Sequence, residues 1–268
     1  TFSEKMGSKG TEVARRVAEQ LGYHFYDTEA IQNAAQETGF LKDIKEIDEK
    51  PPPLFQRLFS NKPEIHLDRL NSVIYELASK GNAVFLGRGS YILLREFKCA
   101  LHIRVTASLE NRIRNLVAGG IDREAAIRAI HKSDHERDAF VKFAFKVDWE
   151  DLDLYDLVLN MDHLTVELAS DIVLHTARSE EIKARSIDAI KSLEMMSLMR
   201  RAEAALMEAG LSSISPSVSI SEPGKIQLSG VVSEQSNKIK AEKILMGIKG
   251  IHSVDNQIKV VLHYSGNV

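Results

Sequence analysis

The chain has 268 residues, more than a single domain usually needs, so two folded units are expected. Its 35 Lys and Arg residues against 38 Asp and Glu leave a formal charge of -3, which excludes a general attraction for nucleic acid and restricts any basic site to a local cluster. The single cysteine, Cys99, excludes an internal disulfide framework, and with no signal peptide and no apolar run of roughly 20 residues it favours a cytoplasmic protein without a transmembrane segment.

The first feature in chain order is a polar loop between an expected strand at residues 1–3 and an expected helix at residues 12–21. Apolar residues repeat at helical spacing along this helix, and Gly22 ends it. Loop amides and a helix N-terminus converge on an anion, and a lysine in the loop reaches the outer phosphates of a nucleotide. The pattern therefore predicts a phosphate-binding loop. Its expected binding residues are Gly7, Ser8, Lys9, Gly10 and Thr11.

The loop departs from the Walker pattern of a glycine, four residues and Gly-Lys, because Ser3 and Ser8 replace the two glycines. A serine has a side chain where glycine would let the backbone wrap a phosphate closely. We therefore expect a cradle that is looser or differently shaped around Gly7 and Gly10. The alternative is a Gly/Ser turn that only caps the helix. Because the chain begins inside an expected strand, we also expect that the natural protein has residues before Thr1.

Short apolar runs and helical patterns alternate along the following residues. Buried parallel strands are expected at residues 1–3, 83–86, 101–105 and 157–160, with a short strand before Asp27, and helices at about 12–21, 28–38, 65–79, 109–118, 123–130 and 166–176. This alternation predicts a doubly wound α/β fold, in which a parallel sheet carries helices on both faces. The segment from Lys50 to Pro53 cannot continue a helix and is expected to be an exposed connection.

Two polar residues follow expected strands, at the edge where ligands bind in such folds. Asp27 ends the short strand after Gly22 and precedes a helix, so it either contacts a ligand or caps that helix. Arg88 follows the strand at residues 83–86, and the glycines on either side leave its guanidinium free for a bidentate phosphate contact. The alternative for Arg88 is a surface salt bridge.

These motifs, in this order, resemble the cytidylate kinase-like branch of the nucleoside monophosphate kinases over about residues 1–176. The matching segments are Lys9-Gly10-Thr11, Leu21-Gly22 with Asp27, Val84 to Ser90, Val105 to Arg114, Lys132 to Arg137, Asp148-Trp149, and Tyr155 to Asn160. The resemblance implies a P-loop kinase-like fold, ATP and Mg2+ as cofactors, and a nucleoside monophosphate as the second substrate. Catalysis would then consist of positioning and charge neutralisation, without a protein nucleophile.

The resemblance also implies that Lys9, Asp134 and Arg137 are catalytic. Asp134 and Arg137 are three residues apart in an expected helix, so they share one of its faces. The family uses this pair on a helical lid over the phosphate groups. Without a ligand, the same two residues would form an ordinary (i, i+3) ion pair.

Other residues would bind the two nucleotides. By resemblance, Arg112 lies near the phosphates or the adenine of ATP, while Asp27 and Arg88 bind the monophosphate. Thr11 would hold the phosphates or a water on the metal, and no side chain is expected to ligate the metal directly. For the segment with Arg112, a helix cap at Ser108 and arginines on the helix surface explain the same sequence without a ligand.

Two departures leave the acceptor base open. Bacterial cytidylate kinases follow the first acid with Ser-Gly-Ala-x-Tyr-Arg, whereas this chain has Thr28 to Asn33 and lacks that tyrosine and arginine. They also have an aspartate where this chain has Gly89. A CMP- or dCMP-like nucleotide remains the expected acceptor class.

The C-terminal stretch has a different pattern. Strands are expected at residues 218–220, 225–230 and 254–262, and a helix at about 235–248. Residues 226–232 and 248–256 resemble the BON domain, whose pattern has a strand ending in Leu-Ser-Gly and a late Gly-Val-x-x-Val-x-Asn turn. Gly230 and Gly250 lie at turns that need left-handed backbone. The expected domains are a kinase-like domain at 1–178, a helical connector at 179–197 and a BON interaction module at 198–268.

Three hypotheses follow. The first is an ATP- and Mg2+-dependent nucleoside monophosphate kinase, or a close relative, with a BON module that senses or tethers a partner of unknown identity. The second is a non-catalytic nucleotide sensor or degenerate kinase that acts through the BON module, and the third is a structural adaptor that does not bind ATP. A homo-oligomer is compatible with the sequence. A dehydrogenase and a zinc site are not expected, because no Gly-x-Gly-x-x-Gly follows the first strand and the histidines form no ligand-spaced cluster.

Overall fold

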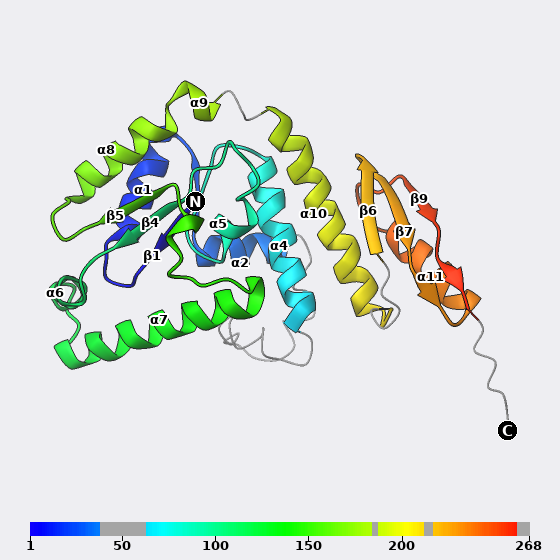
Figure 1. The fold of residues 1–268 in the computed structure, drawn as a ribbon, viewed down its shortest axis with the longest axis horizontal. Coiled ribbons are helices and arrows are strands. Elements are labelled where there is room, and N and C mark those ends of the chain that lie inside the picture. The colour runs from blue at the N-terminus through cyan, green and yellow to red at the C-terminus, as the bar shows by residue number, and fades with distance from the viewer. Residues whose placement is uncertain (38–62, 184–186, 212–216, 262–268) are drawn as a thin grey trace. The chain divides into compact units, whose positions relative to one another are not determined.

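The computed structural model describes residues 1–37, 63–183, 187–211 and 217–261 (Figure 1). Its strands are β1 (Phe2–Glu4), β2 (His24–Tyr26), β3 (Ala83–Phe85), β4 (Ile103–Thr106), β5 (Leu157–Asn160), β6 (Ser217–Glu222), β7 (Lys225–Ser229), β8 (Val231–Val232), β9 (Ser253–Asn256) and β10 (Lys259–Val260). Its helices are α1 (Gly10–Leu21), α2 (Thr28–Glu37), α4 (Pro63–Ser79), α5 (Ser90–Leu93), α6 (Leu109–Ala118), α7 (Arg123–Phe145), α8 (Val166–Ala177), α9 (Glu180–Lys183), α10 (Ile187–Glu208) and α11 (Gln235–Met246). The proline segment from Lys50 to Pro53 lies outside the described residues.

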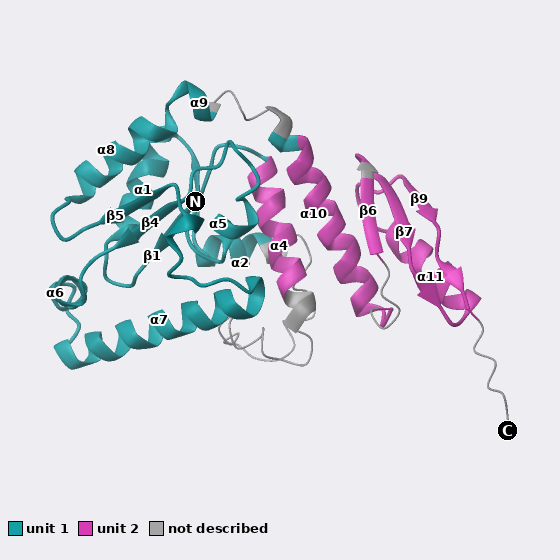
Figure 2. Ribbon diagram, in the orientation of Figure 1, with its two compact units in different colours: residues 1–42, 80–190 teal, residues 43–79, 191–268 magenta. Residues whose placement is uncertain are grey.

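The chain divides into two compact units, residues 1–42 with 80–190 and residues 43–79 with 191–268 (Figure 2). Within the described residues, no helix combines the length and the apolar character needed to cross a bilayer.

The first unit contains a parallel sheet of five strands. β4 pairs with β1 on one side and with β5 on the other, and β2 pairs with β3. A single parallel bridge between Phe2 and Leu86 joins the two sets, so the strand order is β2-β3-β1-β4-β5. Such pairing needs a crossover helix between successive strands, which α1 supplies between β1 and β2. The structure confirms the predicted α/β fold with a P-loop kinase-like parallel sheet.

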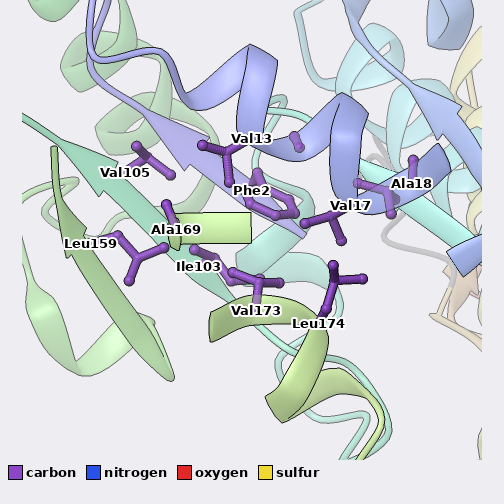
Figure 3. Packing of buried hydrophobic residues seen from close by; sticks show 12 residues of the cluster. Phe2, Val13, Val17, Ala18, Ile103, Val105, Leu159, Ala169, Val173 and Leu174 are labelled. Atoms are coloured by element: carbon purple, nitrogen blue, oxygen red, sulfur yellow. The ribbon is translucent and has the colours of Figure 1, made fainter. Parts of the chain in front are cut away.

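One face of this sheet packs against α1 and α8. Figure 3 shows the contact, in which Phe2, Ile103 and Val105 of the strands meet Val13 and Val17 of α1 and Val173 of α8. All of these side chains are buried. Residues alternate between the two faces of a strand, so Ser3 and Arg104 point to the other side of the sheet. Arg104 is buried on that side, so β4 carries a charged side chain inside the protein between two apolar residues, Ile103 and Val105.

The second unit contains α4, most of α10 and a small α+β fold. Its sheet has the order β6-β7-β9, with β6 antiparallel and β9 parallel to β7. The C-terminal half of α10, from Leu198, packs with α11 and this sheet in one core that includes Leu206, Leu228 and Leu245. Gly230 and Gly250 have positive φ angles of 141° and 99°, as their positions in the sequence predict.

Candidate functional site

The polar loop between β1 and α1 contains two residues with left-handed backbone. Gly7 has φ 82° and Lys9, which directly precedes α1, has φ 65°. A non-glycine residue with positive φ is uncommon and persists where the surrounding structure holds it, often at functional sites. The Lys9 side chain is exposed, and within the described residues its ammonium has no hydrogen-bond or ion-pair partner. Hydrogen bonds from the Glu167 backbone N–H and from the Thr165 side chain lower the pKa of Glu167 near the start of α8. The charges of Arg16 and Lys9 lower this pKa further.

Ser8 is fully buried, and both of its polar groups bond inside the protein. Its hydroxyl donates to the Val105 carbonyl at 3.3 Å, and its backbone N–H donates to the Lys5 carbonyl at 3.0 Å. The side chain therefore points into the protein rather than into the space beside the loop. The Ser8 side chain therefore does not occupy the space where a phosphate would bind.

Helix α6 contacts the loop between β1 and α1 through two side-chain hydrogen bonds. Arg112 Nε donates to the Met6 carbonyl at 2.7 Å, and Asn115 Nδ2 donates to the Gly7 carbonyl at 2.9 Å. The approach is so close that a Cβ atom on Gly7 would lie 2.7 Å from the Arg112 carbonyl oxygen. Glycine at this position thus satisfies both the left-handed backbone and the contact with α6.

Replacing Gly7 by alanine is expected to lower the free energy of unfolding by roughly 2 to 3 kcal/mol, because the strained backbone and the overlap with Arg112 add together. Gly22 offers a matched control, since it has φ 68° but no atom within 4 Å of an added Cβ. Gly22→Ala should lower stability by only about 1 kcal/mol. Urea unfolding of both variants measures the difference, and equal values would contradict the close contact between loop and helix.

Arg112 also pairs with Asp134 of α7. Its Nη1 and Nη2 donate to the two carboxylate oxygens at 2.9 and 2.7 Å, and the arginine is only 4% exposed. A bidentate pair of this kind fixes both side chains. Arg112 therefore ties α6, the loop and α7 together.

Arg137 lies one turn after Asp134 on α7 but has a different partner. Its Nη2 is 3.8 Å from Oε1 of Glu4, the last residue of β1. Glu4 also accepts a hydrogen bond from the Thr11 backbone N–H and another from the Thr11 hydroxyl, each at 2.8 Å. Burial lowers the pKa of Arg137, and the charges of Glu4 and Asp134 oppose this shift. Glu4 was not predicted as a site residue.

Arg104 of β4 is a second site residue that sequence reasoning missed. It is 2% exposed, and its Nη1 donates to the Trp149 carbonyl and the Tyr155 hydroxyl, both at 3.1 Å, while Nη2 donates to Glu150 at 2.9 Å. The guanidinium carbon lies 4.0 Å from the centre of the Trp149 ring. The Asp-Trp and Tyr-Asp segments thus enclose a buried cation. The signal in the sequence was an arginine inside an otherwise apolar strand.

Arg88 lies in a turn of three successive left-handed residues just after β3. Gly87, Arg88 and Gly89 have φ angles of 78°, 60° and 72°. A Cβ atom on Gly89 would overlap the ring of Phe145, which therefore fills the space next to this turn. Burial, and after it the neighbouring charge of Arg137, lower the pKa of the half-buried Arg88 guanidinium to about 10, so it stays charged at neutral pH.

Arg88, Arg104 and Arg112 all lie near enough to Arg137 for their charges to interact with its charge. These four arginines differ in their partners. Three of them pair with carboxylates, namely Arg104 with Glu150 at 2.9 Å, Arg112 with Asp134 at 2.7 Å, and Arg137 with Glu4 at 3.8 Å. In the described part of the chain, Arg88 has no carboxylate partner. A half-buried charge without a counter-ion is unfavourable unless an anion binds there. Among the described residues, Arg88 is therefore the arginine of this group whose charge is not balanced by a carboxylate.

Asp27 shows the alternative role that its position allowed. Its Oδ1 accepts the Ala30 N–H at 2.9 Å at the start of α2, and its Oδ2 lies 3.7 Å from Arg15. The carboxylate thus caps a helix, as acids commonly do. Three expected residues, Arg112, Asp134 and Arg137, meet around the loop, while Lys9 remains exposed beside it.

Comparison with known proteins gives matches over both parts of the chain. The model of the cytidylate kinase-like family matches residues 1–163, and the model of the BON domain matches residues 200–261. A cytidylate kinase from Methanopyrus kandleri is 30% identical over 164 residues, which cover 58% of this chain and 79% of that protein. One from Staphylothermus marinus is 28% identical over 170 residues, covering 62% and 88%.

A solved structure of an uncharacterized protein from Eubacterium ventriosum shares the fold. It has a TM-score of 0.53 at 18% identity and covers 66% of this chain and 95% of that chain. At this identity the likeness concerns the fold alone. The chain belongs to the cytidylate kinase-like family.

Proposed function

We propose that the chain transfers a phosphoryl group from ATP to a nucleoside monophosphate of the CMP or dCMP type. The observation that carries this proposal is Arg88, a charged and half-buried arginine near Arg137 that has no carboxylate partner among the described residues. A phosphate of the acceptor would supply the missing negative charge. The two cytidylate kinases among the relatives support the class of reaction.

In the proposed reaction, an oxygen of the acceptor phosphate attacks the γ-phosphorus of ATP while the bond to the bridging β,γ oxygen breaks, and ADP leaves. Lys9 and the loop backbone hold the phosphates of ATP, and Arg88 holds the acceptor phosphate. Arg137 neutralises charge between the two groups, while Arg112 and Asp134 keep α6, α7 and the loop in register. No protein base is needed, because the attacking oxygen is already anionic.

The donor set of the loop also fits a magnesium ion. Glu4 and Thr11 offer carboxylate and hydroxyl oxygens, which are the ligands that Mg2+ prefers, and the ion would neutralise phosphate charge when bound. The C-terminal BON module, proposed to span 198–268 after a connector at 179–197, would then act as an interaction module for a partner of unknown identity.

A phosphotransfer assay with a panel of monophosphates tests the proposal. ATP and Mg2+ with CMP or dCMP should give ADP and the matching diphosphate at a rate above that with AMP, GMP or UMP. ATP binding without transfer to any acceptor would favour the sensor hypothesis, and absence of ATP binding would favour the adaptor.

A further inference from the structure

Glu4 places a carboxylate directly before the predicted phosphate-binding loop. It ends β1, directly before the loop, and its side chain is 13% exposed. Its carboxylate accepts both the backbone N–H and the hydroxyl of Thr11, in the first turn of α1. The Thr11 N–H and hydroxyl belong to the N-terminal end of α1, which is the end where the phosphates of a nucleotide are expected.

Gly10 explains how the carboxylate fits there. In the common Gly-Lys-Ser/Thr loop, the residue after the lysine carries the hydroxyl that contacts Mg2+. This chain has Gly10 at that position, and an added Cβ atom would lie 2.6 Å from Cβ and 2.7 Å from Oε2 of Glu4. The Glu4 side chain therefore occupies the space that a serine or threonine at position 10 would need.

The charge of Glu4 indicates what it does there. A carboxylate beside a triphosphate is strongly repelled, and the attraction of Arg137 at 3.8 Å offsets only part of this repulsion. A divalent cation between the carboxylate and the phosphates removes it. The two hydrogen bonds from Thr11 leave lone pairs on both carboxylate oxygens, so Glu4 can bind a cation without losing them.

We propose that Glu4 is a direct ligand of the divalent cation that accompanies the triphosphate, beside the Thr11 hydroxyl that donates to it. The inference rests on the proposed function, since it requires that ATP binds at the loop. Mg2+ sites with bound nucleotide commonly use one or two carboxylates together with phosphate oxygens, which matches one glutamate on this loop. The cation and ATP should then bind with strong mutual dependence.

Calorimetry of ATP binding with Mg2+ and with EDTA, for the full chain and for Glu4→Gln, tests this inference. Glu4→Gln should weaken binding of ATP with Mg2+ by about tenfold or more, because a ligand is lost. In EDTA the same variant should bind ATP as tightly as the wild type or more tightly, since the repulsion is gone. Binding of Mn2+, followed by electron paramagnetic resonance in the presence of ATP, should weaken in parallel.

Glu12→Gln is the matched control. It removes the same charge one residue after Thr11, from an exposed position in the first turn of α1. It should leave the effect of Mg2+ on ATP affinity unchanged. Thermal unfolding of each variant confirms that it is folded, and Glu4→Asp, which keeps the charge, should retain part of the Mn2+ binding if Glu4→Gln is unstable.

The outcomes separate the alternatives. If Glu4→Gln binds ATP more tightly in both conditions, the carboxylate competes with phosphate and the inference is wrong. If Glu4→Gln weakens binding equally with Mg2+ and with EDTA, Glu4 has only a structural role. If the wild type binds no ATP in either condition, the proposed function itself fails, and the inference fails with it.

Discussion

Replacing Arg88 by methionine is expected to lower kcat/KM for phosphoryl transfer by about 100- to 1,000-fold, because the acceptor phosphate loses the cation proposed to bind it. Methionine keeps much of the volume of the side chain, so the turn after β3 should persist. The same measurement on Arg114→Met gives the control, since Arg114 is an exposed arginine on α6. Steady-state kinetics with CMP as the varied substrate provide the values.

A second substitution separates charge from geometry at this position. Arg88→Lys keeps the positive charge but loses the planar fork that binds a phosphate with two hydrogen bonds. It should therefore recover only part of the activity lost in Arg88→Met. If Arg88→Met keeps the activity of the wild type, Arg88 does not bind the acceptor.

Arg112→Met should lower the free energy of unfolding by about 3 kcal/mol, because it leaves Asp134 and the Met6 carbonyl without their buried donor. Arg123 provides a matched control. It forms a bidentate pair with Glu110 at 3.0 and 2.8 Å, but both side chains are exposed. Arg123→Met should change the stability little, since solvent screens exposed pairs. Urea unfolding gives both values.

The double variant Arg112→Met/Asp134→Leu tests the physical reason. When both charged partners become apolar, no uncompensated charge remains, and part of the lost stability should return. A double variant less stable than Arg112→Met would show that the pair itself, rather than the stranded carboxylate, determines the effect. If Arg112→Met loses no more stability than Arg123→Met, Arg112 does not hold α6, the loop and α7 together.

The sequence predicted the elements of the first unit well where the pattern was local. The helix expected at 109–118 matches α6, because Ser108 caps it and Gly119 follows it. The helix expected from 123 to 130 continues to Phe145 in one piece. Its second half carries Phe140 and Val141 on a buried face, and its polar residues made the pattern resemble a separate lid segment. Tertiary packing extends a helix beyond what local periodicity reveals.

The site was predictable in its residues but less so in its pairs. Asp134 and Arg137 share a face of α7, yet each pairs with a residue from another element, Arg112 and Glu4. Such partners are far apart in the sequence, so spacing alone does not show which carboxylate meets which arginine. Arg104 was missed for a related reason. Its partners, Trp149 and Glu150, are about 45 residues away, and only the sheet brings them together.

The most direct test of the central claim is calorimetry of ATP with Mg2+ binding to the wild-type chain and to Lys9→Ala. Lys9 is exposed and has no ion-pair partner in the described residues, so its removal should leave the fold intact. If the loop before α1 binds the phosphates, the variant should bind ATP at least about tenfold more weakly, which corresponds to roughly 1.4 kcal/mol. Equal affinity of the two proteins would contradict the account.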